Sequence, residues 1–428
     1  MAENTVKNYR NMVMYQVFVR NFSDSGSFSA VRDRLEEIRE LGTDIIWFMP
    51  IHPIGEQKRK GSLGSPYAIS DYRAVNPEFG TLRDFRELVD AIHEHGMKCI
   101  IDVVYNHTSP DSVLSKLHPG WFYHREDGSF GNRVGDWSDI VDLDYDSREL
   151  RRYQIDTLKM WATIVDGFRC DVAPLIPLDF WMQARREVEA VRPGCLWLSE
   201  SIEPEFITYM RGRGLTALSD GEIYRAFDLC YDYDVYGIWR DCLSGKASLA
   251  EYCDAVNRQE YIYPDNFVKL RFLENHDQPR AAFLIPDDKA RRNWTAFTYF
   301  QKGMVLIYAG QEYGIDHLPS LFDKDPVPFA SAVKDERAFL KRLADIKRHE
   351  VFTDSVYRVE AVDNSWLVAK HTSKTSQALG VFAVKDSTGW VPVDFEDGVY
   401  TNLIDGTQVN VFRGGIQSFG ESIIIIKQ

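Results

Sequence analysis

The sequence predicts a parallel α/β fold followed by a small all-β domain, and three observations support this prediction. Short apolar segments alternate with helical patterns over most of the 428 residues, as in folds built from repeated βαβ units. The segment 98–105 is almost continuously apolar, which is typical of parallel strands covered on both faces. After about residue 353 the helical patterns stop, and short strands separated by turn residues follow. The α/β part is long enough for a closed (β/α)8 barrel, which needs about 250 residues.

The first three strands are predicted at 12–19, 43–50 and 98–105. Apolar residues at helical spacing predict a helix over 28–42, and another over 81–96. Both helices end at a glycine, which is a common stop signal. Strand and helix therefore alternate from the start of the chain.

The alternation continues through the rest of the predicted barrel. Further strands are expected at 163–172, 195–201, 267–274 and 303–310, and helices at 147–162, 180–191, 289–302 and 336–350. The short segment 215–219 is a candidate for one more strand between them.

The domain organisation follows from where this rhythm is interrupted. Residues 1–105 and 147–352 are assigned to the barrel, 106–146 to a short insertion on its rim, and 353–428 to the all-β domain. The insertion is rich in glycine, aspartate and aromatic residues and carries no strong helical pattern. Its aromatic side chains are either sugar platforms or packing of the loop against itself, and packing is favoured: Trp121, Phe122, Tyr123 and Trp137.

Composition excludes several classes of protein. A net charge of −14 and the lack of a long Lys/Arg run exclude a nucleic-acid binder. No run approaches the roughly 18 apolar residues of a membrane helix, so no membrane association is expected. The six cysteines show neither CxxC nor zinc-type spacing, and the N-terminus is polar. A cytoplasmic protein with reduced thiols is expected.

Polar residues gather at the carboxyl ends of successive predicted strands. The third strand ends in Asp102 and the segment 106–107, the fourth in Arg169 and Asp171, and the fifth in Glu200, while segment 274–277 follows a later strand. A single acidic residue after a strand would indicate only a helix cap. Because the carboxyl ends of barrel strands meet at one rim, four such groups together indicate an active site.

The residue types suit the cleavage of a glycosidic bond. Such cleavage needs one proton donor on the leaving oxygen and a second carboxylate below the anomeric carbon. Asp171 shares a strand face with Arg169, whose positive charge would keep it ionised. Glu200 ends an apolar strand that could desolvate it and raise its pKa, and Asp277 could hold sugar hydroxyls.

Other chemistries are disfavoured by missing motifs. A metal-assisted hydrolase would need a ligand motif such as HExxH, which is absent, and Arg169 would repel the cation, so no catalytic metal is predicted. A serine hydrolase would need GxSxG, and a dinucleotide-binding fold would need GxGxxG after the first strand. Neither motif is present in the sequence.

The ordered motifs resemble those of the α-amylase superfamily of retaining glycoside hydrolases. Four segments look like its catalytic segments in the right order: DVVYNH, GFRCD, LSES and ENHD. Three more match accessory segments of the family: TDIIWFMPIHPIG, DLDY and GMVLIYAGQEYG. The resemblance covers nearly the whole chain and implies a (β/α)8 TIM barrel, a small rim domain after the third strand and a C-terminal β-sandwich.

The resemblance also implies a role for each matching residue. Asp171 matches the nucleophile, Glu200 the general acid/base and Asp277 the stabiliser of the transition state. The remaining matches are substrate-binding residues and one structural support of the site, namely Tyr67 as the stacking aromatic, His107, Arg169 and His276 around the sugar, and Asp102 behind Arg169.

At three places the sequence departs from the family pattern, and these departures limit which properties of the family can be expected of this chain. Pro174 and Leu175 stand where many α-amylases carry Lys-His, so binding on the leaving-group side does not carry over. Val172 follows the nucleophile, a choice seen in some α-1,6-acting relatives. The rim insertion is short, and only Asn106 and Asp142 match calcium-ligand positions. A structural calcium is thus possible, and no cofactor is expected to be required.

The leading hypothesis is retaining hydrolysis of α-glucosidic bonds, with α-1,4 bonds favoured, in malto-oligosaccharides or α-glucans. The alternatives are a transglycosylase of the 4-α-glucanotransferase type and an α-1,6-acting oligosaccharide glucosidase. A non-catalytic carbohydrate-binding relative is least favoured, because such relatives typically lose one of the three carboxylates and all three are present here. The sequence does not predict an oligomeric state.

Overall fold

The computed structural model describes residues 3–135, 137–385 and 387–428. Eight parallel strands close into a barrel in the order β1-β10-β9-β8-β7-β6-β3-β2. Their bounds are β1 Val13–Val17, β2 Ile45–Phe48, β3 Lys98–Val103, β6 Gly167–Cys170, β7 Leu196–Ser199, β8 Leu229–Tyr231, β9 Val268–Arg271 and β10 Met304–Tyr308. The predicted (β/α)8 barrel is therefore confirmed.

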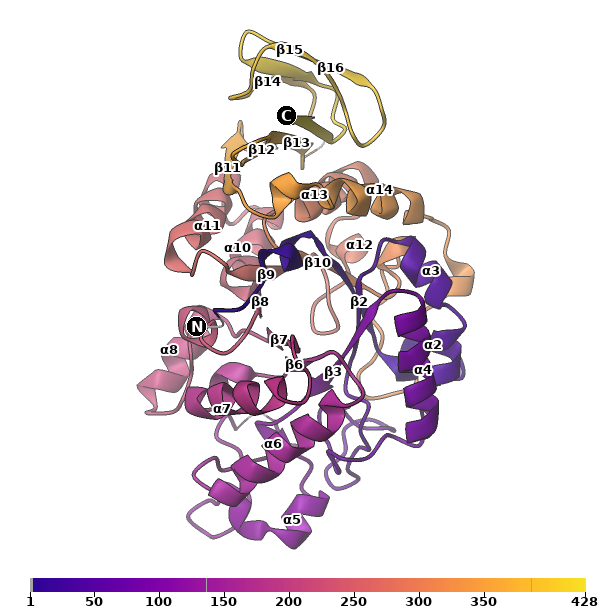
Figure 1. Ribbon diagram of the computed structural model, residues 1–428, viewed down its shortest axis with the longest axis vertical. Coiled ribbons are helices and arrows are strands. Elements are labelled where there is room, and N and C mark those ends of the chain that lie inside the picture. The colour runs from indigo at the N-terminus through magenta and orange to yellow at the C-terminus, as the bar shows by residue number, and fades with distance from the viewer. Residues whose placement is uncertain (1–2, 136, 386) are drawn as a thin grey trace.

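Helices surround the barrel (Figure 1). Their bounds are α1 Val19–Phe22, α2 Phe28–Arg32, α3 Leu35–Glu40, α4 Leu82–Glu94, α6 Arg148–Ala162, α7 Leu178–Glu189, α8 Pro204–Gly212, α9 Asp220–Ile223, α10 Tyr233–Leu243, α11 Leu249–Ile262, α12 Ala281–Leu284, α13 Asp288–Phe300 and α14 Arg337–Lys347. Side-chain caps start several of them; Thr81 and Asp84, for example, form a reciprocal capping box at α4. No helix among the described residues is long and apolar enough to cross a membrane.

Two predicted elements differ from the structure. The helix expected over 28–42 is split into α2 and α3, because the backbone of Arg34 (φ −113°, ψ 10°) leaves the helical region. The segment 215–219 is not a strand, and the sixth barrel strand is β8, which pairs with β7 and β9. Only three residues long, β8 offers too little alternation to be recognised from sequence.

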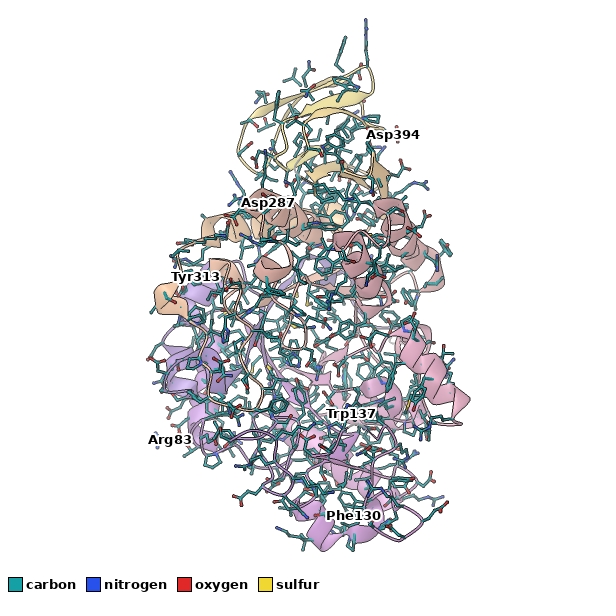
Figure 2. All side chains as sticks on the ribbon, turned by 180° about the vertical axis from the view of Figure 1, so that it is seen from behind. Arg83, Phe130, Trp137, Asp287, Tyr313 and Asp394 are labelled. Carbon is teal, nitrogen blue, oxygen red and sulfur yellow. The ribbon has the colours of Figure 1, made fainter. Side chains whose placement is uncertain are left out.

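The rim insertion follows β3 and is anchored by a small sheet. In it β4 (His107–Thr108) pairs with β5 (Val141–Asp142), and a short helix α5 (Val113–Leu117) lies between them in sequence. Phe122 is buried with its ring 5.0 Å from that of Phe130, so this aromatic side chain packs the loop. Figure 2 shows Phe130 at the end of the molecule opposite Asp394 of the C-terminal domain.

The C-terminal domain is a sandwich of two antiparallel sheets. One has the order β11-β12-β13-β18 and the other β14-β17-β16-β15. Their bounds are β11 Val356–Val362, β12 Trp366–Thr372, β13 Gln377–Ala383, β14 Gly389–Pro392, β15 Gly398–Thr401, β16 Gln408–Phe412, β17 Gly415–Ser418 and β18 Ile423–Lys427. The first sheet rests on the barrel, since the ring of Phe382 lies 5.5 Å from Phe297 and 5.6 Å from Phe300 of α13.

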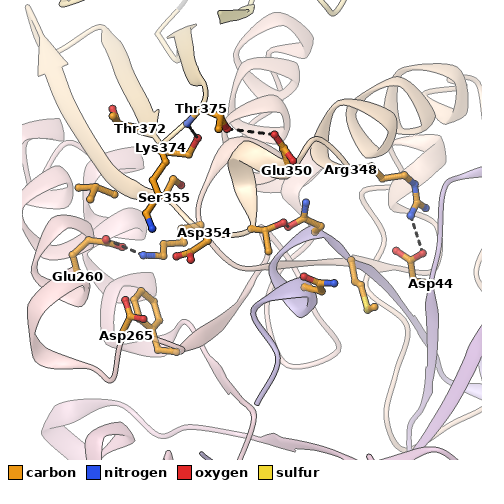
Figure 3. A pocket seen from close by; sticks show the side chains of 18 residues that line it. Asp44, Glu260, Asp265, Arg348, Glu350, Asp354, Ser355, Thr372, Lys374 and Thr375 are labelled. Atoms are coloured by element: carbon orange, nitrogen blue, oxygen red, sulfur yellow. Dashed lines mark hydrogen bonds and ion pairs between the residues drawn. The ribbon is translucent and has the colours of Figure 1, made fainter. Parts of the chain in front are cut away.

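A hollow of about 1200 Å³ lies where the sandwich meets the amino-terminal ends of the barrel strands (Figure 3). Charged groups that line it pair with one another. Lys302 Nζ is 2.9 Å from Glu260 Oε2, and Arg348 Nη1 is 3.0 Å from Asp44 Oδ1. Both pairs join residues of the barrel itself, and the hollow lies at the end of the barrel opposite the polar strand ends.

Candidate active site

Arg169 is the centre of the polar cluster at the carboxyl end of the barrel. It lies on β6 beside Asp102 of β3, and both side chains are fully buried. Its Nη1 nitrogen is 2.8 Å from Asp102 Oδ1 and 2.8 Å from Asp171 Oδ1. The alternation of strand β6 therefore brings Arg169 and Asp171 together on the inner face, as the sequence predicts.

A third carboxylate completes the set around this guanidinium. Arg169 Nη2 is 2.9 Å from Glu200 Oε1, an ion pair without hydrogen-bond geometry at Nη2. Arg169 Nε donates to the Tyr231 hydroxyl over 3.2 Å, and the ring of Trp47 lies 5.3 Å from the guanidinium carbon. One cation thus holds three acidic groups, counting Asp102 and Asp171, so the site carries more negative than positive charge.

The two reactive carboxyl groups differ in their pKa. Burial raises the pKa of Asp171 to about 6, although the positive charge of Arg169 opposes the shift. Burial raises the pKa of Glu200 to about 8, again against Arg169 and with support from the charge on Asp171. At pH 7 Asp171 is therefore mostly ionised and Glu200 mostly protonated, the combination that a nucleophile and a general acid require.

Val172 links these two carboxyl groups through its backbone. Its φ of +36° and ψ of 41° lie in the left-handed region, which a β-branched residue adopts at a cost of about 1–3 kcal/mol. In this conformation the Val172 N–H donates to Glu200 Oε2 over 2.7 Å. The strained residue after Asp171 thereby fixes the position of Glu200.

His276 and Tyr67 form the wall that faces Asp277. The Gln16 side-chain amide donates to His276 Nδ1 over 2.7 Å, so the other ring nitrogen carries a hydrogen. That nitrogen, Nε2, is 2.5 Å from the Tyr67 hydroxyl and 3.0 Å from Asp277 Oδ2, and the two rings stack at 5.5 Å and 19°. The Tyr67 hydroxyl in turn donates to Asp102 Oδ2 over 3.1 Å.

Asp277 stands at the mouth of the site, with 36% of its side chain exposed. Burial raises its pKa, but His276 and then Arg169 outweigh burial, so its pKa lies below the ordinary value. Asp277 is thus an ionised, accessible carboxylate next to the buried pair.

His107 closes the side of the site next to the rim insertion. Its Nε2 nitrogen is 4.0 Å from Asp171 Oδ2, and its ring lies 5.7 Å from that of Trp137. Burial lowers the pKa of His107 to about 4, so the imidazole is neutral at pH 7 and can donate or accept a hydrogen bond without adding charge.

Every predicted site residue reaches this cluster, and the structure adds two more. Gln16 is a polar residue in the otherwise apolar strand β1, and this could have indicated that its side chain faces the site. Tyr231 lies on β8, the strand that the sequence did not reveal, so no pattern could have placed it. Glu274 of the ENHD segment turns away and pairs with Arg280 at 2.7 Å.

The residues at the calcium-ligand positions of the family can be tested directly. Asp142 is buried; its Oδ2 accepts the Arg133 N–H over 2.7 Å, and its Oδ1 has no hydrogen-bond partner among the described residues. Asn106 lines the same cavity of about 210 Å³. Carboxylate and amide oxygens are ligands that Ca²⁺ takes, so Asn106 and Asp142 could supply two of the roughly 6–8 that it needs. Among the described residues no group of three or more His, Cys, Asp or Glu side chains gathers at a position that could hold a metal ion. Arg133 Nη1, 3.6 Å from Asp142 Oδ2, offers a competing positive charge.

Family models match both parts of the chain. The model of the α-amylase catalytic domain matches residues 16–118 and 114–356, and that of the bacterial α-amylase C-terminal domain matches residues 358–425. The chain therefore belongs to the α-amylase family of glycoside hydrolases.

Solved structures and a curated relative agree with this assignment. An α-amylase from Lactobacillus plantarum is 45% identical with a TM-score of 0.96, over 99% of this chain and 100% of that one. A maltogenic α-amylase from Thermotoga neapolitana is 33% identical with a TM-score of 0.88, over 98% and 99% of the two chains. The α-amylase MalA of Haloarcula japonica is 26% identical over 93% of this chain, which spans 61% of that relative's length.

Proposed function

We propose that the protein hydrolyses α-glucosidic bonds, chiefly α-1,4 bonds in malto-oligosaccharides or α-glucans, with retention of configuration. The observation that carries this proposal is the pair Asp171 and Glu200, held on the two terminal nitrogens of one guanidinium. Retaining enzymes need two carboxyl groups about 5–5.5 Å apart, and neighbouring nitrogens of Arg169 suit that spacing. The names of the similar α-amylases support the substrate class.

In the first step the glycosidic bond breaks and an ester bond to the protein forms. Glu200 gives its proton to the glycosidic oxygen while a carboxylate oxygen of Asp171 attacks the anomeric carbon. The electron pair of the breaking bond stays on the leaving oxygen, which departs as a hydroxyl of the released sugar. Arg169 holds Asp171 in place, and Val172 N–H holds Glu200.

In the second step water releases the bound sugar. Glu200, now a carboxylate, takes a proton from water, and the water oxygen attacks the anomeric carbon so that Asp171 leaves as a carboxylate. Asp277, which His276 Nε2 holds at 3.0 Å, faces the sugar in both steps and accepts hydrogen bonds from its hydroxyl groups. The stacked Tyr67 ring supplies a flat apolar floor.

The stereochemistry of the first product tests this proposal. Proton NMR during cleavage of maltoheptaose is expected to show the α-anomer at the new reducing end before mutarotation. A β-anomer as the first product would exclude a double displacement at Asp171.

Transglycosylation is the second candidate, since a sugar hydroxyl can replace water in the second step. One observation favours an apolar leaving-group side: Val172 and Leu175 pack against the cluster of Ile202, Met210 and Ala217. Such a surface excludes water better than the Lys-His pair of many α-amylases would. Products longer than maltoheptaose from maltoheptaose would favour transfer, and cleavage of isomaltotriose would favour an α-1,6-acting glucosidase.

We propose further that Asn106 and Asp142 hold a structural cation, with Ca²⁺ as the expected ion. The unpartnered, buried Asp142 Oδ1 supports this assignment. The expected result is that EDTA lowers the melting temperature, that added CaCl₂ restores it, and that Asp142→Asn abolishes the response. An unchanged melting temperature in EDTA would mean that the guanidinium of Arg133 alone neutralises Asp142.

We infer a reducing compartment, such as the cytoplasm, as the place of action. The structure holds six free cysteines, all of them buried, and secreted proteins of this kind commonly pair their cysteines. Thiol titration of the protein from its native cells in denaturant is expected to count six thiols. A lower count, restored by a reductant, would contradict this inference.

A further inference from the structure

The outer face of the sheet β14-β17-β16-β15 carries an uncharged row of side chains. Trp390 of β14 pairs with Gln417 of β17, and Val399 of β15 pairs with Asn410 of β16. The pairing of Val411 with Ile416 places Asn410 opposite Gln417, so the four residues lie in one row across the sheet. All four are exposed, while their neighbours along each strand turn inward. We call Trp390, Gln417, Asn410 and Val399 the outer row.

The Trp390 ring lies flat on the sheet because of a glycine. A Cβ atom added at Gly415 would come within 2.4 Å of Trp390 Cε2 and 2.5 Å of its Nε1. The indole therefore rests on the backbone of Gly415, covers it, and leaves its other face to solvent, with 49% of the residue exposed. Phe412, 50% exposed, pairs with Gly415 on the other side. A flat ring held in this way is a platform, not a mobile side chain.

We propose that the outer row binds an α-glucan chain, at a site separate from the barrel mouth. The apolar C–H face of a glucose ring packs flat on an indole, and the amides of Gln417 and Asn410 can donate to and accept from its hydroxyl groups. The row has no charge, although the chain carries a net charge of −14, so a neutral polymer fits it and an anionic one does not. This inference rests on the proposed function for the choice of glucan.

A second copy of the chain is a poorer occupant of this face. One exposed ring, one valine and the two amides between them fall far short of the roughly 800 Å² that each partner buries in a standard interface. The row also lies at the end of the molecule opposite the rim insertion (Figures 1 and 2), so a glucan bound there leaves the barrel mouth open. Such a site would keep the enzyme on an insoluble or branched substrate between cleavage events.

Binding to glycogen and insoluble amylose tests the proposal. The measurement is made in an Asp171→Asn background, so that the polymer is not degraded, by depletion and by affinity electrophoresis. Trp390→Ala is expected to weaken binding about tenfold, as the loss of one stacking contact predicts. Gly415→Ala is expected to weaken it as well, because the new methyl group lifts the indole off the sheet. Phe419→Ala, an exposed aromatic residue outside the row, is the matched control and should bind normally.

Each other outcome has a definite meaning. Unchanged binding by Trp390→Ala and Gly415→Ala would overturn the proposal, and so would sedimentation data showing that Trp390→Ala dissociates a dimer. In the active background, Trp390→Ala should cleave maltotriose as fast as the parent enzyme. If the parent cleaves no α-glucan at all, the proposed function fails; if it cleaves them but Trp390 is irrelevant to polymer binding, only this inference fails.

Discussion

The cluster around Arg169 and the cluster around Lys269 and Arg271 are both buried in the barrel, but they balance charge differently. Arg169 alone faces three carboxyl groups. Lys269 and Arg271, alternating on β9, share three aspartates. Lys269 Nζ is 2.5 Å from Asp220 Oδ2 and 2.8 Å from Asp234 Oδ1, and Arg271 Nη1 is 2.7 Å from Asp232 Oδ2. The first cluster is short of positive charge, and the second is nearly neutral.

The consequence is visible in the pKa values. In the second cluster burial raises the pKa of Asp220 and Asp232 against the charges of Lys269 and Arg271, but Lys269 and hydrogen bonds from Gln259 and Tyr263 hold the pKa of Asp234 below the ordinary value. Glu200 has no comparable support, and burial raises its pKa to about 8. We call the second cluster saturated because two cations share its three acids, an arrangement that serves stability. The Arg169 cluster has one cation for three acids, and its Glu200 can exchange a proton near neutral pH, as catalysis requires.

The largest effects are expected when one aspartate of each cluster is changed to asparagine, since one change should affect catalysis and the other stability. Asp171→Asn is expected to lower kcat about 10⁴-fold or more on maltoheptaose, because the nucleophile is lost, with little change in melting temperature. The matched change Asp232→Asn is expected to cost about 3–5 kcal/mol of unfolding free energy, because Arg271 loses its buried partner. Denaturant unfolding and single-turnover kinetics measure both. An Asp232→Asn enzyme that is stable but inactive would mean that the two clusters are one functional unit.

A second prediction concerns the pH profile. Activity needs Asp171 ionised, so kcat/KM should rise as pH passes about 6, and it needs Glu200 protonated, so it should fall as pH passes about 8. For a substrate with a good leaving group, such as a 4-nitrophenyl α-maltoside, protonation matters less and the alkaline limb should flatten. An alkaline limb that is equally steep for both substrates would remove Glu200 as the general acid.

A third prediction uses the same pKa shift as a statement about stability. The pKa of Glu200 is raised in the folded protein, so the unfolded chain loses its proton first and stability falls as pH rises from about 4.5 to about 8. Glu200→Gln is therefore expected to raise the unfolding free energy by about 1–3 kcal/mol at pH 8 and by nothing at pH 4. Urea titrations at both pH values test this. A gain that is equal at both would trace to packing and not to charge.

The smallest effect is expected from a neutral neighbour of Arg169, the Tyr231 hydroxyl. Tyr231→Phe removes one neutral hydrogen bond to the guanidinium, worth about 0.5–1.5 kcal/mol, and should lower kcat/KM about three- to tenfold. Steady-state kinetics and the position of the acid limb measure the change. Tyr263→Phe, which removes a hydrogen bond to Asp234 in the saturated cluster, is the control and should leave kinetics unchanged.

Most of the fold and of the site could be predicted, for identifiable reasons. Strand β6 could be predicted because Arg169 and Asp171 interrupt an apolar segment two residues apart, which places both on one face of a strand. The resemblance to the family segments then gives the role of each residue. The same alternation of Lys269 and Arg271 on β9 looks alike in sequence yet belongs to the saturated cluster. Only tertiary contacts distinguish the two.

Other features could not be predicted from the sequence, because the backbone conformation or length of their own segment gives no sign of them. A left-handed valine is locally disfavoured, so the N–H bond from Val172 to Glu200 could not be foreseen. The strand β8 has three residues, and Tyr231 went unplaced with it. Both are set by the closed barrel and not by their own segments.

The packing of the sandwich on α13 has a consequence for how the protein unfolds. Phe382 sits between Phe297 and Phe300, and the buried His371 Nε2 meets the Phe300 carbonyl at 2.8 Å. The barrel and the sandwich thus share one core at this seam, and neither can open without exposing aromatic surface of the other. We expect the barrel and the sandwich to unfold together on heating, as a single cooperative unit. The C-terminal domain is then part of the barrel's stability, and deleting it should unfold the barrel.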